Sequence, residues 1–225
     1  MKTNEKTKAH TRYRLPTTPQ WPRGEIVPGV TTILDTQLGW NKRVLMAWCR
    51  REALAGNDPD KMADEAADSG TVAHRLVEAH IKGVEADLSD FTKNQIDAGE
   101  TGFLAFLDWE KEQDIIYEHI EYPVVSQQYR YGGTIDMVAH KNGSLWILDL
   151  KTSSGIWPEM KCQVAAYSMA FEEQEQQQVH EWHILKLDKK DGSFQHHKLS
   201  GPEVAKAWEV FKHCRALYDL QKEIK

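Results

Sequence analysis

The dipeptide Asn142-Gly143 constrains this chain more than any other short feature, because it stands between two runs rich in strand-forming residues. The runs cover residues 134–140 and 144–150, and an Asn-Gly pair between such runs is the strongest short-range signal for a β-hairpin. If the pair forms a two-residue turn, residues that face each other across the hairpin have numbers with a constant sum. The sequence therefore predicts two strands and also which side chains oppose each other.

This register places Asp136 directly opposite Asp149. Two carboxylates in that position repel each other and destabilise a sheet unless a cation lies between them. Lys151 lies two residues beyond Asp149 and therefore points to the same face. Carboxylates suit Mg²⁺ or Mn²⁺, and a lysine beside such an ion can orient or deprotonate water or stabilise charge on a phosphate. The alternative is a surface ion pair at a strand end, which leaves the opposed carboxylates uncompensated.

Gln163 and Tyr167, further along the chain, are four residues apart on an expected helix and therefore share a face. The elements Gly133-x-x-Asp136, Asp149-x-Lys151 and Gln163-x-x-x-Tyr167, in this order, resemble the core of the PD-(D/E)xK nucleases, in the RecB-like branch. The resemblance covers about residues 69–190, with a weaker likeness to phage nucleases from Val30 onward. It implies that Gln163 and Tyr167 hold Lys151 and the scissile phosphate in place. Their alternative role is ordinary helix packing and capping.

The same resemblance implies a metal-binding histidine on a helix upstream of the aspartates, in a Gly-x-x-x-His element. Gly70 to His74 matches this element, Ser69 is expected to be the N-cap of the helix, and imidazole is a competent Mn²⁺ ligand. Glu121, in a strand before the hairpin, is a further candidate, although an exposed strand glutamate is the more ordinary interpretation. The expected ligands of one or two ions are His74, Asp136, Asp149 and the backbone carbonyl of Leu150.

Residues 41–55 have the apolar spacing of a helix, and they carry basic side chains with tryptophans close by. Aromatic and basic residues together suit single-stranded nucleic acid, because bases stack on rings and phosphates pair with cations. A buried tryptophan with solvated arginines explains the same pattern equally well. The candidates for nucleic-acid contacts are Trp40, Arg43, Trp48 and Arg51.

The composition bounds the class of protein. A content of 40% hydrophobic and 28% charged residues is ordinary for a globular protein, and a net charge of −6 does not suggest one that coats DNA through a general basic surface. Three cysteines, odd in number and far apart, make neither a disulfide framework nor a zinc site, and no iron–sulfur cluster is expected. The first residues lack the apolar stretch of a secretion signal and no run is long enough for a membrane, so we expect a cytoplasmic protein of a bacterial or phage-infected host cell.

The remaining segments complete a predicted α/β fold, with a central mixed sheet flanked by helices and a helical part at the N-terminal end. Residues 1–28 are basic and contain four prolines, which predicts a flexible arm. Residues 29–225 are expected to form a single nuclease domain. Helices are predicted over 91–113, 159–171 and 202–225, and strands over 117–125, 180–188 and 193–198.

The residues and the resemblance together predict a Mg²⁺- or Mn²⁺-dependent deoxyribonuclease, most simply an exonuclease that acts on single-stranded DNA ends in recombination, replication or repair. The resemblance implies products with a 5′-phosphate and a 3′-hydroxyl. The chain has no Gly-x-x-x-x-Gly-Lys motif, so unwinding would come from a recombination or helicase partner. Two alternatives are a structure-selective endonuclease and a non-catalytic nucleic-acid- or protein-binding module. Polarity, DNA against RNA preference, ion number and oligomeric state do not follow from the sequence.

Overall fold

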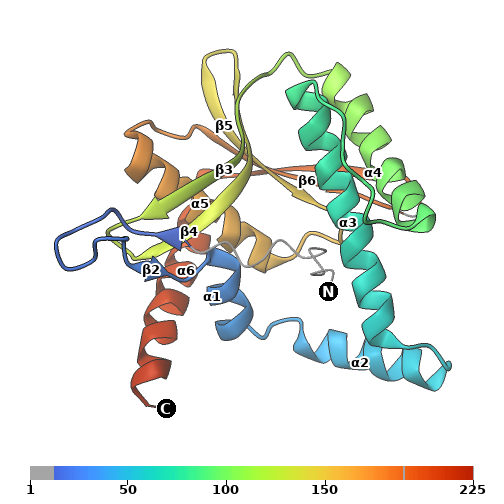
Figure 1. The fold of residues 1–225 in the computed structure, drawn as a ribbon, viewed down its shortest axis with the longest axis horizontal. Helices are drawn as coiled ribbons and strands as arrows, with labels where there is room; N and C mark the ends of the chain where they lie inside the picture. The colour runs from blue at the N-terminus through green and yellow to red at the C-terminus, as the bar shows by residue number, and fades with distance from the viewer. Residues whose placement is uncertain (1–12, 190, 225) are drawn as a thin grey trace.

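The computed structural model describes residues 13–189 and 191–224, and it shows a five-stranded sheet with helices on both sides (Figure 1). The strand order is β3-β4-β5-β6-β7, and the sheet is mixed because β5 and β6 run parallel while the other neighbours are antiparallel. The predicted α/β class is confirmed. The strands of the sheet are β3 (Ile116–Ser126), β4 (Tyr131–Lys141), β5 (Ser144–Lys151), β6 (Glu181–Leu187) and β7 (Phe194–Leu199). The helices are α1 (Val30–Gln37), α2 (Lys42–Leu54), α3 (Pro59–Lys82), α4 (Lys93–Lys111), α5 (Pro158–Glu175) and α6 (Gly201–Glu223).

The β4–β5 hairpin has the register predicted from its turn. A ladder of five residue pairs runs back from the turn, beginning with Lys141 opposite Ser144. Asn142 and Gly143 have φ angles of +51° and +79°, as the two central positions of a type I′ turn require. The turn therefore sets which residues of β4 and β5 can meet at the far end of the hairpin.

Side chains along the strands alternate between two hydrophobic clusters, one on each face of the sheet. Ile147 belongs to the cluster that joins the sheet to α1, α5 and α6, and its neighbour Leu148 belongs to the cluster with α3 and α4. Helix α5 connects the parallel strands β5 and β6, which need a crossover of this kind. Because both faces are covered, β5 is a nearly continuous buried run, within which Asp149 is the one acidic residue.

Helix α3 begins well before the predicted N-cap. Its N-cap is Asp58, whose side chain accepts hydrogen bonds from backbone N–H groups of the first turn, and Pro59 occupies the first helical position. Ser69 lies inside the helix, where its hydroxyl donates to the carbonyl of Glu65 at 2.8 Å. The prediction of Ser69 as N-cap is wrong because a serine hydroxyl is equally well satisfied by the carbonyl four residues back.

The segment from Tyr13 to Pro28, the described part of the expected arm, contains two short strands. Within it, β1 (Tyr13–Arg14) pairs antiparallel with β2 (Ile26–Val27). The Tyr13 side chain packs so closely over Gly132 that a Cβ there would come within 2.4 Å of it, and the Tyr13 hydroxyl lies 3.0 Å from Oγ1 of Thr134. An aromatic ring therefore attaches this segment to β4. Residues 1–12 lie outside the described residues, so the arm, like the division at residue 28, stays a prediction.

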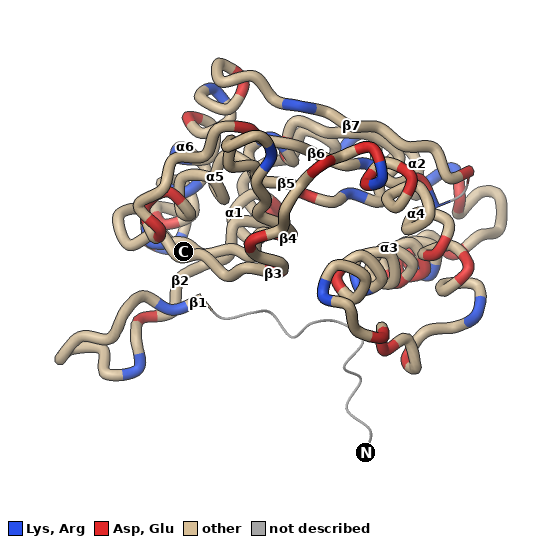
Figure 2. Tube along the Cα trace, turned by 90° about the horizontal axis from the view of Figure 1, so that it is seen from above, with Lys and Arg blue, Asp and Glu red and all other residues tan. Residues whose placement is uncertain are grey.

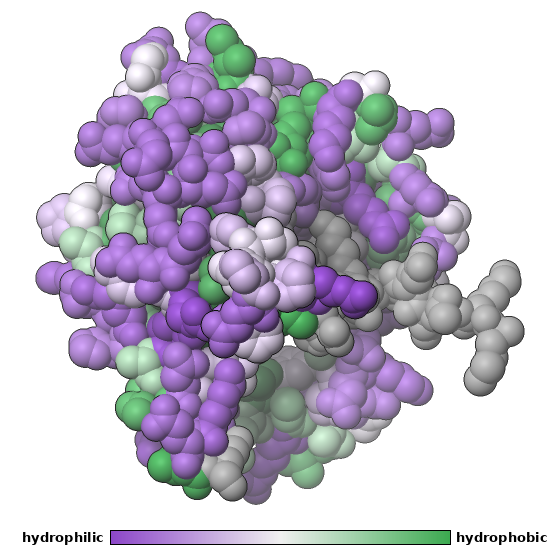
Figure 3. Space-filling view, turned by 60° about the vertical axis from the view of Figure 1, so that its left-hand side comes forward, coloured by the Kyte–Doolittle hydropathy of each residue, from purple (hydrophilic) through white to green (hydrophobic). Residues whose placement is uncertain are grey.

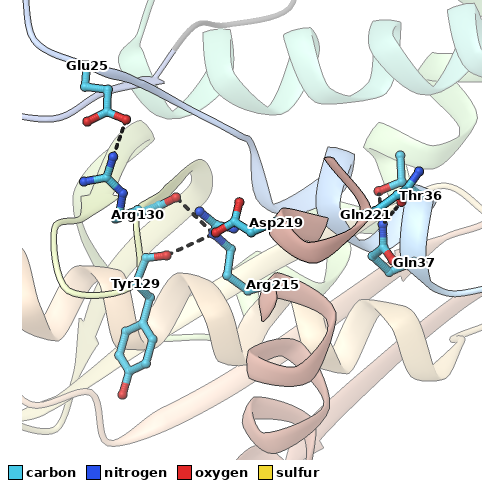
Figure 4. Close-up of polar contacts among 8 residues, drawn as sticks. All are labelled: Glu25, Thr36, Gln37, Tyr129, Arg130, Arg215, Asp219 and Gln221. Carbon is cyan, nitrogen blue, oxygen red and sulfur yellow. Dashed lines mark hydrogen bonds and ion pairs between the residues drawn. The ribbon is translucent and has the colours of Figure 1, made fainter. Parts of the chain in front are cut away.

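Helix α6 is tied to the turn between β3 and β4 through Arg215 (Figure 4). Nε of Arg215 donates to the carbonyl oxygens of Tyr129 and Arg130 at 3.0 and 3.1 Å, and Nη1 lies 2.6 Å from Asp219. Buried carbonyls without a hydrogen-bond partner are costly, so this arginine stabilises an otherwise irregular turn. The turn leads directly into β4.

Helix α2 lies apart from the sheet, between α1 and α3, at the lower edge of Figure 1. None of its residues is buried. The segment is helical as predicted, but its apolar residues do not contribute to the core. Large hydrophobic side chains exposed on α2 and just before it are Trp40, Val44, Leu45, Met46 and Leu54.

The surface carries charges of both signs. Figure 2 shows basic and acidic positions interspersed along the trace, in keeping with the net charge of −6. The face drawn in Figure 3 is mainly hydrophilic, with hydrophobic side chains in scattered groups. Among the helices of the described residues, none has the length and apolar character needed to cross a membrane.

Candidate active site

The two aspartates of the hairpin meet at the end of β4 and β5 that lies away from the turn. The paired ladder ends at Met137 and Leu148, one residue short of the two aspartates, so their direct opposition stays a prediction. There the backbone N–H of Leu150 donates to Oδ2 of Asp136 at 2.7 Å. A hydrogen bond from a backbone N–H to a carboxylate is strong and directional, so it orients Asp136 beside the C-terminal end of β5.

Asp149 lies at the buried end of the site, with a side chain that is 1% exposed. Nζ of Lys151 lies 2.6 Å from Oδ2 of Asp149. Burial raises the pKa of Asp149 to about 6; the Lys151 ammonium opposes this rise, and the nearby Asp136 carboxylate adds to it. Lys151 is thus a cation of the kind that the opposed carboxylates require.

A third carboxylate joins the site from β3. Ligand atoms of His74, Glu121 and Asp136 all lie within 4.8 Å of one another, and Nδ1 of His74 is 3.8 Å from Oδ1 of Asp136. Glu121 has a φ of +52°, and the pairing of β3 with β4 shifts by one residue between Tyr117 and His119. A non-glycine residue at positive φ is uncommon and is concentrated at functional sites. Glu121 is half-buried and lies beside His74 and Asp136, so the more ordinary interpretation of it as an exposed strand residue is wrong.

The residues present suit a divalent metal ion. Oδ1 of Asp149 is buried without a hydrogen-bond partner among the described residues, which is costly unless something else satisfies it. Carboxylate oxygens with one imidazole nitrogen form a donor set that fits Mg²⁺ or Mn²⁺. The predicted ligands His74 and Asp136 lie together, whereas Glu121 completes the three-residue group in place of Asp149. The N–H of Leu150 is already bonded to Asp136, and the role of its carbonyl stays a prediction.

Gln163 and Tyr167 line the site from α5. Nε2 of Gln163 donates to the hydroxyl of Tyr167 at 2.8 Å, and Gln163 lies with Lys151 on the wall of one cavity. Burial, together with the negative charges of Asp149 and Asp136, raises the pKa of Tyr167 well above its usual value, so its hydroxyl stays protonated. The role of this pair in holding Lys151 stays a prediction.

The cavity over the site has a volume of about 420 Å³ and is open to solvent. Besides the predicted residues it is lined by Thr152, Ser153 and Lys189, which the sequence analysis did not single out. Thr152 and Ser153 directly follow Lys151, where β5 ends, so their place in the sequence was a readable signal. Lys189 had no such signal, since only the fold brings the β6–β7 turn to α3, where its ammonium contacts the carbonyl of Ala66.

The four predicted nucleic-acid contacts lie on or just before α2, outside this cavity. Trp40 is 53% exposed and Trp48 is partly buried, so neither is a core tryptophan. Arg43 is exposed, and Arg51 pairs with Glu52 at 2.9 Å. Their contact with nucleic acid stays a prediction.

A mixed sheet whose central hairpin ends in two aspartates and a lysine, with a histidine and a glutamate beside them, defines a candidate metal-dependent hydrolase. The model of the PD-(D/E)XK nuclease superfamily matches residues 45–223. The chain therefore belongs to the PD-(D/E)XK nuclease superfamily, whose members are hydrolases that act on nucleic acid with divalent metal ions.

Two solved structures are similar to this one. The first is a crystal structure of a candidate exonuclease from Eubacterium rectale, with a TM-score of 0.47 and 10% sequence identity over 64% of each chain. The second is the crystal structure of a protein named SSO0001, with a TM-score of 0.33 and 13% identity over 65% of this chain and 73% of the other. The match thus spans less than two thirds of the first of these structures. No curated protein matches the chain significantly.

Proposed function

We propose that this protein is a Mg²⁺- or Mn²⁺-dependent deoxyribonuclease that removes nucleotides from single-stranded DNA ends. The observation that supports this most strongly is the ion pair between buried Asp149 and Lys151, 2.6 Å apart, beside the His74, Glu121 and Asp136 group. A buried carboxylate with a raised pKa, paired with a lysine that lines an open cavity, is the pattern of a reactive site.

In this proposal the metal ion is held by His74, Glu121 and Asp136, with Asp149 and the Leu150 carbonyl as further ligands. When bound, the ion supplies Lewis-acid polarisation of the phosphate and lowers the pKa of a bound water. The positive charge of the ion would offset the negative charge of the carboxylates, so that they would not repel the anionic phosphate.

Lys151 orients the attacking water and stabilises negative charge that develops on the phosphate. Its ammonium is held by Asp149, so little conformational freedom is lost when substrate arrives. Gln163 and Tyr167 position Lys151 and the scissile phosphate from α5. Water adds to phosphorus and the 3′ oxygen leaves with a proton, which gives a 5′-phosphate and a 3′-hydroxyl.

The preference for single strands is part of the proposal and is supported by α2. The exposed ring of Trp40 lies just before this helix, and its basic Lys42 lines a cavity together with Lys151, while the protein as a whole is acidic. Exposed rings and a few cations on an acidic protein suit the stacking of unpaired bases better than electrostatic binding of a duplex. A RecB-like, phage-type role in recombination, replication or repair, a helicase or recombination partner and a cytoplasmic location belong to the same proposal.

The test is cleavage of single- and double-stranded DNA, labelled at either end, with Mg²⁺, with Mn²⁺ and with EDTA. We expect metal-dependent release of mononucleotides from one end of single strands, and loss of this activity in Asp149→Ala and Asp136→Asn. Asp114→Asn is the matched control, because Asp114 is exposed and lies outside the cavity over the site.

Internal fragments, including fragments from circular DNA, would replace the exonuclease by an endonuclease at the same site. Absence of cleavage with either metal, while DNA is still bound, would contradict the proposed enzyme. It would favour a binding module.

A further inference from the structure

A second cavity, of about 400 Å³, adjoins the active site between α1, α2 and the start of α5. Lys151 and Gln163 line both this cavity and the one over the metal-ligand group. The two cavities therefore meet at the proposed catalytic lysine. A nucleic acid with a phosphate at Lys151 would therefore place its neighbouring nucleotide at the entrance of the second cavity.

The lining of the second cavity is largely apolar and includes one exposed aromatic ring. Leu38, Leu45 and Met160 contribute apolar surface, and Trp157 lies at the start of α5 with 41% of its surface exposed. The indole rests against the loop backbone, since a Cβ on Gly155 would come within 3.2 Å of it. A tryptophan held on one side and open on the other presents a flat surface on which a base can stack.

Two carboxylates also line this cavity, Asp35 from α1 and Glu159 from α5. Burial, and after it the charge of Glu159, raises the pKa of Asp35. Oε2 of Glu159 is buried and has no hydrogen-bond partner within the part of the chain that the structure describes. Carboxylates repel phosphate, whereas Lys42 and Lys151 of the same lining attract it. A nucleic acid in this cavity would therefore turn a base toward the carboxylates and its phosphates toward the lysines.

We propose that this cavity binds the base of a nucleotide that flanks the scissile phosphate, stacked on Trp157 and hydrogen-bonded to Asp35 and Glu159. The inference rests on the proposed nuclease function. A carboxylate only accepts hydrogen bonds, and cytosine offers the N4 amino group where thymine offers the O4 acceptor. The cavity therefore selects bases that carry an exocyclic amino group and disfavours thymine. It also requires an unpaired base, because a Watson–Crick partner occupies the same edge.

Steady-state cleavage of single-stranded oligo(dC) and oligo(dT) tests this selectivity. We expect kcat/KM for oligo(dC) to exceed that for oligo(dT) roughly 10-fold. Glu159→Gln should bring the two values together, because an amide donates to O4 of thymine as well as it accepts from N4 of cytosine. Equal values for the wild type, with no change in Glu159→Gln, would overturn the selectivity.

Substitution of Trp157 tests the stacking. Trp157→Ala should raise KM for oligo(dC) roughly 5- to 100-fold with kcat largely retained, and Trp157→Phe should recover most of the loss. Trp21→Ala is the matched control, since Trp21 is similarly exposed, at 47%, but lies in the β1–β2 loop. Unfolding midpoints of all variants separate loss of stacking from loss of structure. An unchanged KM in folded Trp157→Ala would overturn the role of this residue.

Binding of fluorescein-labelled oligo(dC) in EDTA, followed by anisotropy, separates this inference from the proposed activity. Weaker binding by Trp157→Ala, with no cleavage by the wild type under any metal, would support the base cavity and contradict the nuclease. Metal-dependent cleavage by the wild type, with binding unchanged in Trp157→Ala, would overturn the base cavity and leave the nuclease in place.

Discussion

Gly133 lets the ring of Tyr167 lie directly against the backbone of β4. A Cβ at this position would come within 2.3 Å of a ring carbon, far closer than van der Waals contact allows. Tyr167 is 5% exposed and surrounded by the core, so the ring has no room to withdraw. The glycine that precedes Asp136 in the motif therefore has a packing function, and it brings α5 to the site.

We expect Gly133→Ala to lower the free energy of unfolding by about 1–3 kcal/mol, because overpacking forces the ring or the strand to shift. Urea unfolding measures this effect. Gly201→Ala is the control, since a Cβ there meets no atom within 4 Å, and we expect it to be neutral or stabilising by up to about 1 kcal/mol. Equal stability of Gly133→Ala and the wild type would contradict the packing described for Tyr167.

At the scale of residues, the sequence predicts those side-chain positions that depend on the type of turn and on the two-residue period of a strand. The pairing of β4 with β5 as far as Met137 and Leu148 follows from Asn142-Gly143, and the shared face of Asp149 and Lys151 follows from alternation along a strand. The arrival of Glu121 at the site does not, because it depends on a bulge in β3 and on a positive φ that the residue types do not indicate.

At the scale of elements, helix phase is easier to predict than helix bounds. His74 was placed correctly on a helix although α3 begins at Pro59 instead of near Ser69. The error left the prediction of His74 unaffected, since residues four apart share a face wherever the helix starts. For α2, apolar periodicity indicated a helix but said nothing of burial, because a face without a packing partner has the same pattern.

A histidine pair joins β6, β7 and α4 on the face of the sheet with α3 and α4. Nδ1 of His183 lies 2.8 Å from Nε2 of His196, which is bonded in turn to the indole of Trp109. Burial first, and then the neighbouring His196, Lys198 and Lys141, lower the pKa of His183 to about 3. The Glu181 carboxylate lies 3.2 Å from the ring but is paired with Lys198 at 2.6 Å, which offsets its charge.

The folded protein therefore keeps His183 neutral, whereas the unfolded chain protonates it below about pH 6.5. Its contribution to stability is complete above pH 6.5 and is lost as the pH falls toward 3, by at most about 1.4 kcal/mol per pH unit. We expect His183→Asn to have a flatter dependence of the unfolding free energy on pH between about 4 and 6. The exposed His213→Asn is the control. A slope in His183→Asn equal to that of the wild type would contradict this account.

At the scale of the whole molecule, the sheet and its two helical layers bring five distant segments to one site. The segments are α3, β3, β4, β5 and α5, and the match to the superfamily, over residues 45–223, includes all of them. The order of these elements was predictable because each has a clear period. The sequence did not predict that the β6–β7 turn lies against α3 and adds Lys189 to the cavity wall. This contact follows from packing between elements that are distant in sequence.

The most direct test of the central claim compares metal binding and cleavage in the same preparations of Lys151→Ala and Asp136→Asn. Titration calorimetry with Mn²⁺ measures binding, and release from end-labelled single-stranded DNA measures cleavage. We expect Lys151→Ala to bind Mn²⁺ within a few-fold of the wild type but to cleave about 10²–10³-fold more slowly, because only charge stabilisation and water orientation are lost. Asp136→Asn should lose both metal binding and cleavage. Cleavage by Lys151→Ala at the wild-type rate, or Mn²⁺ affinity unchanged in Asp136→Asn, would contradict the site described here.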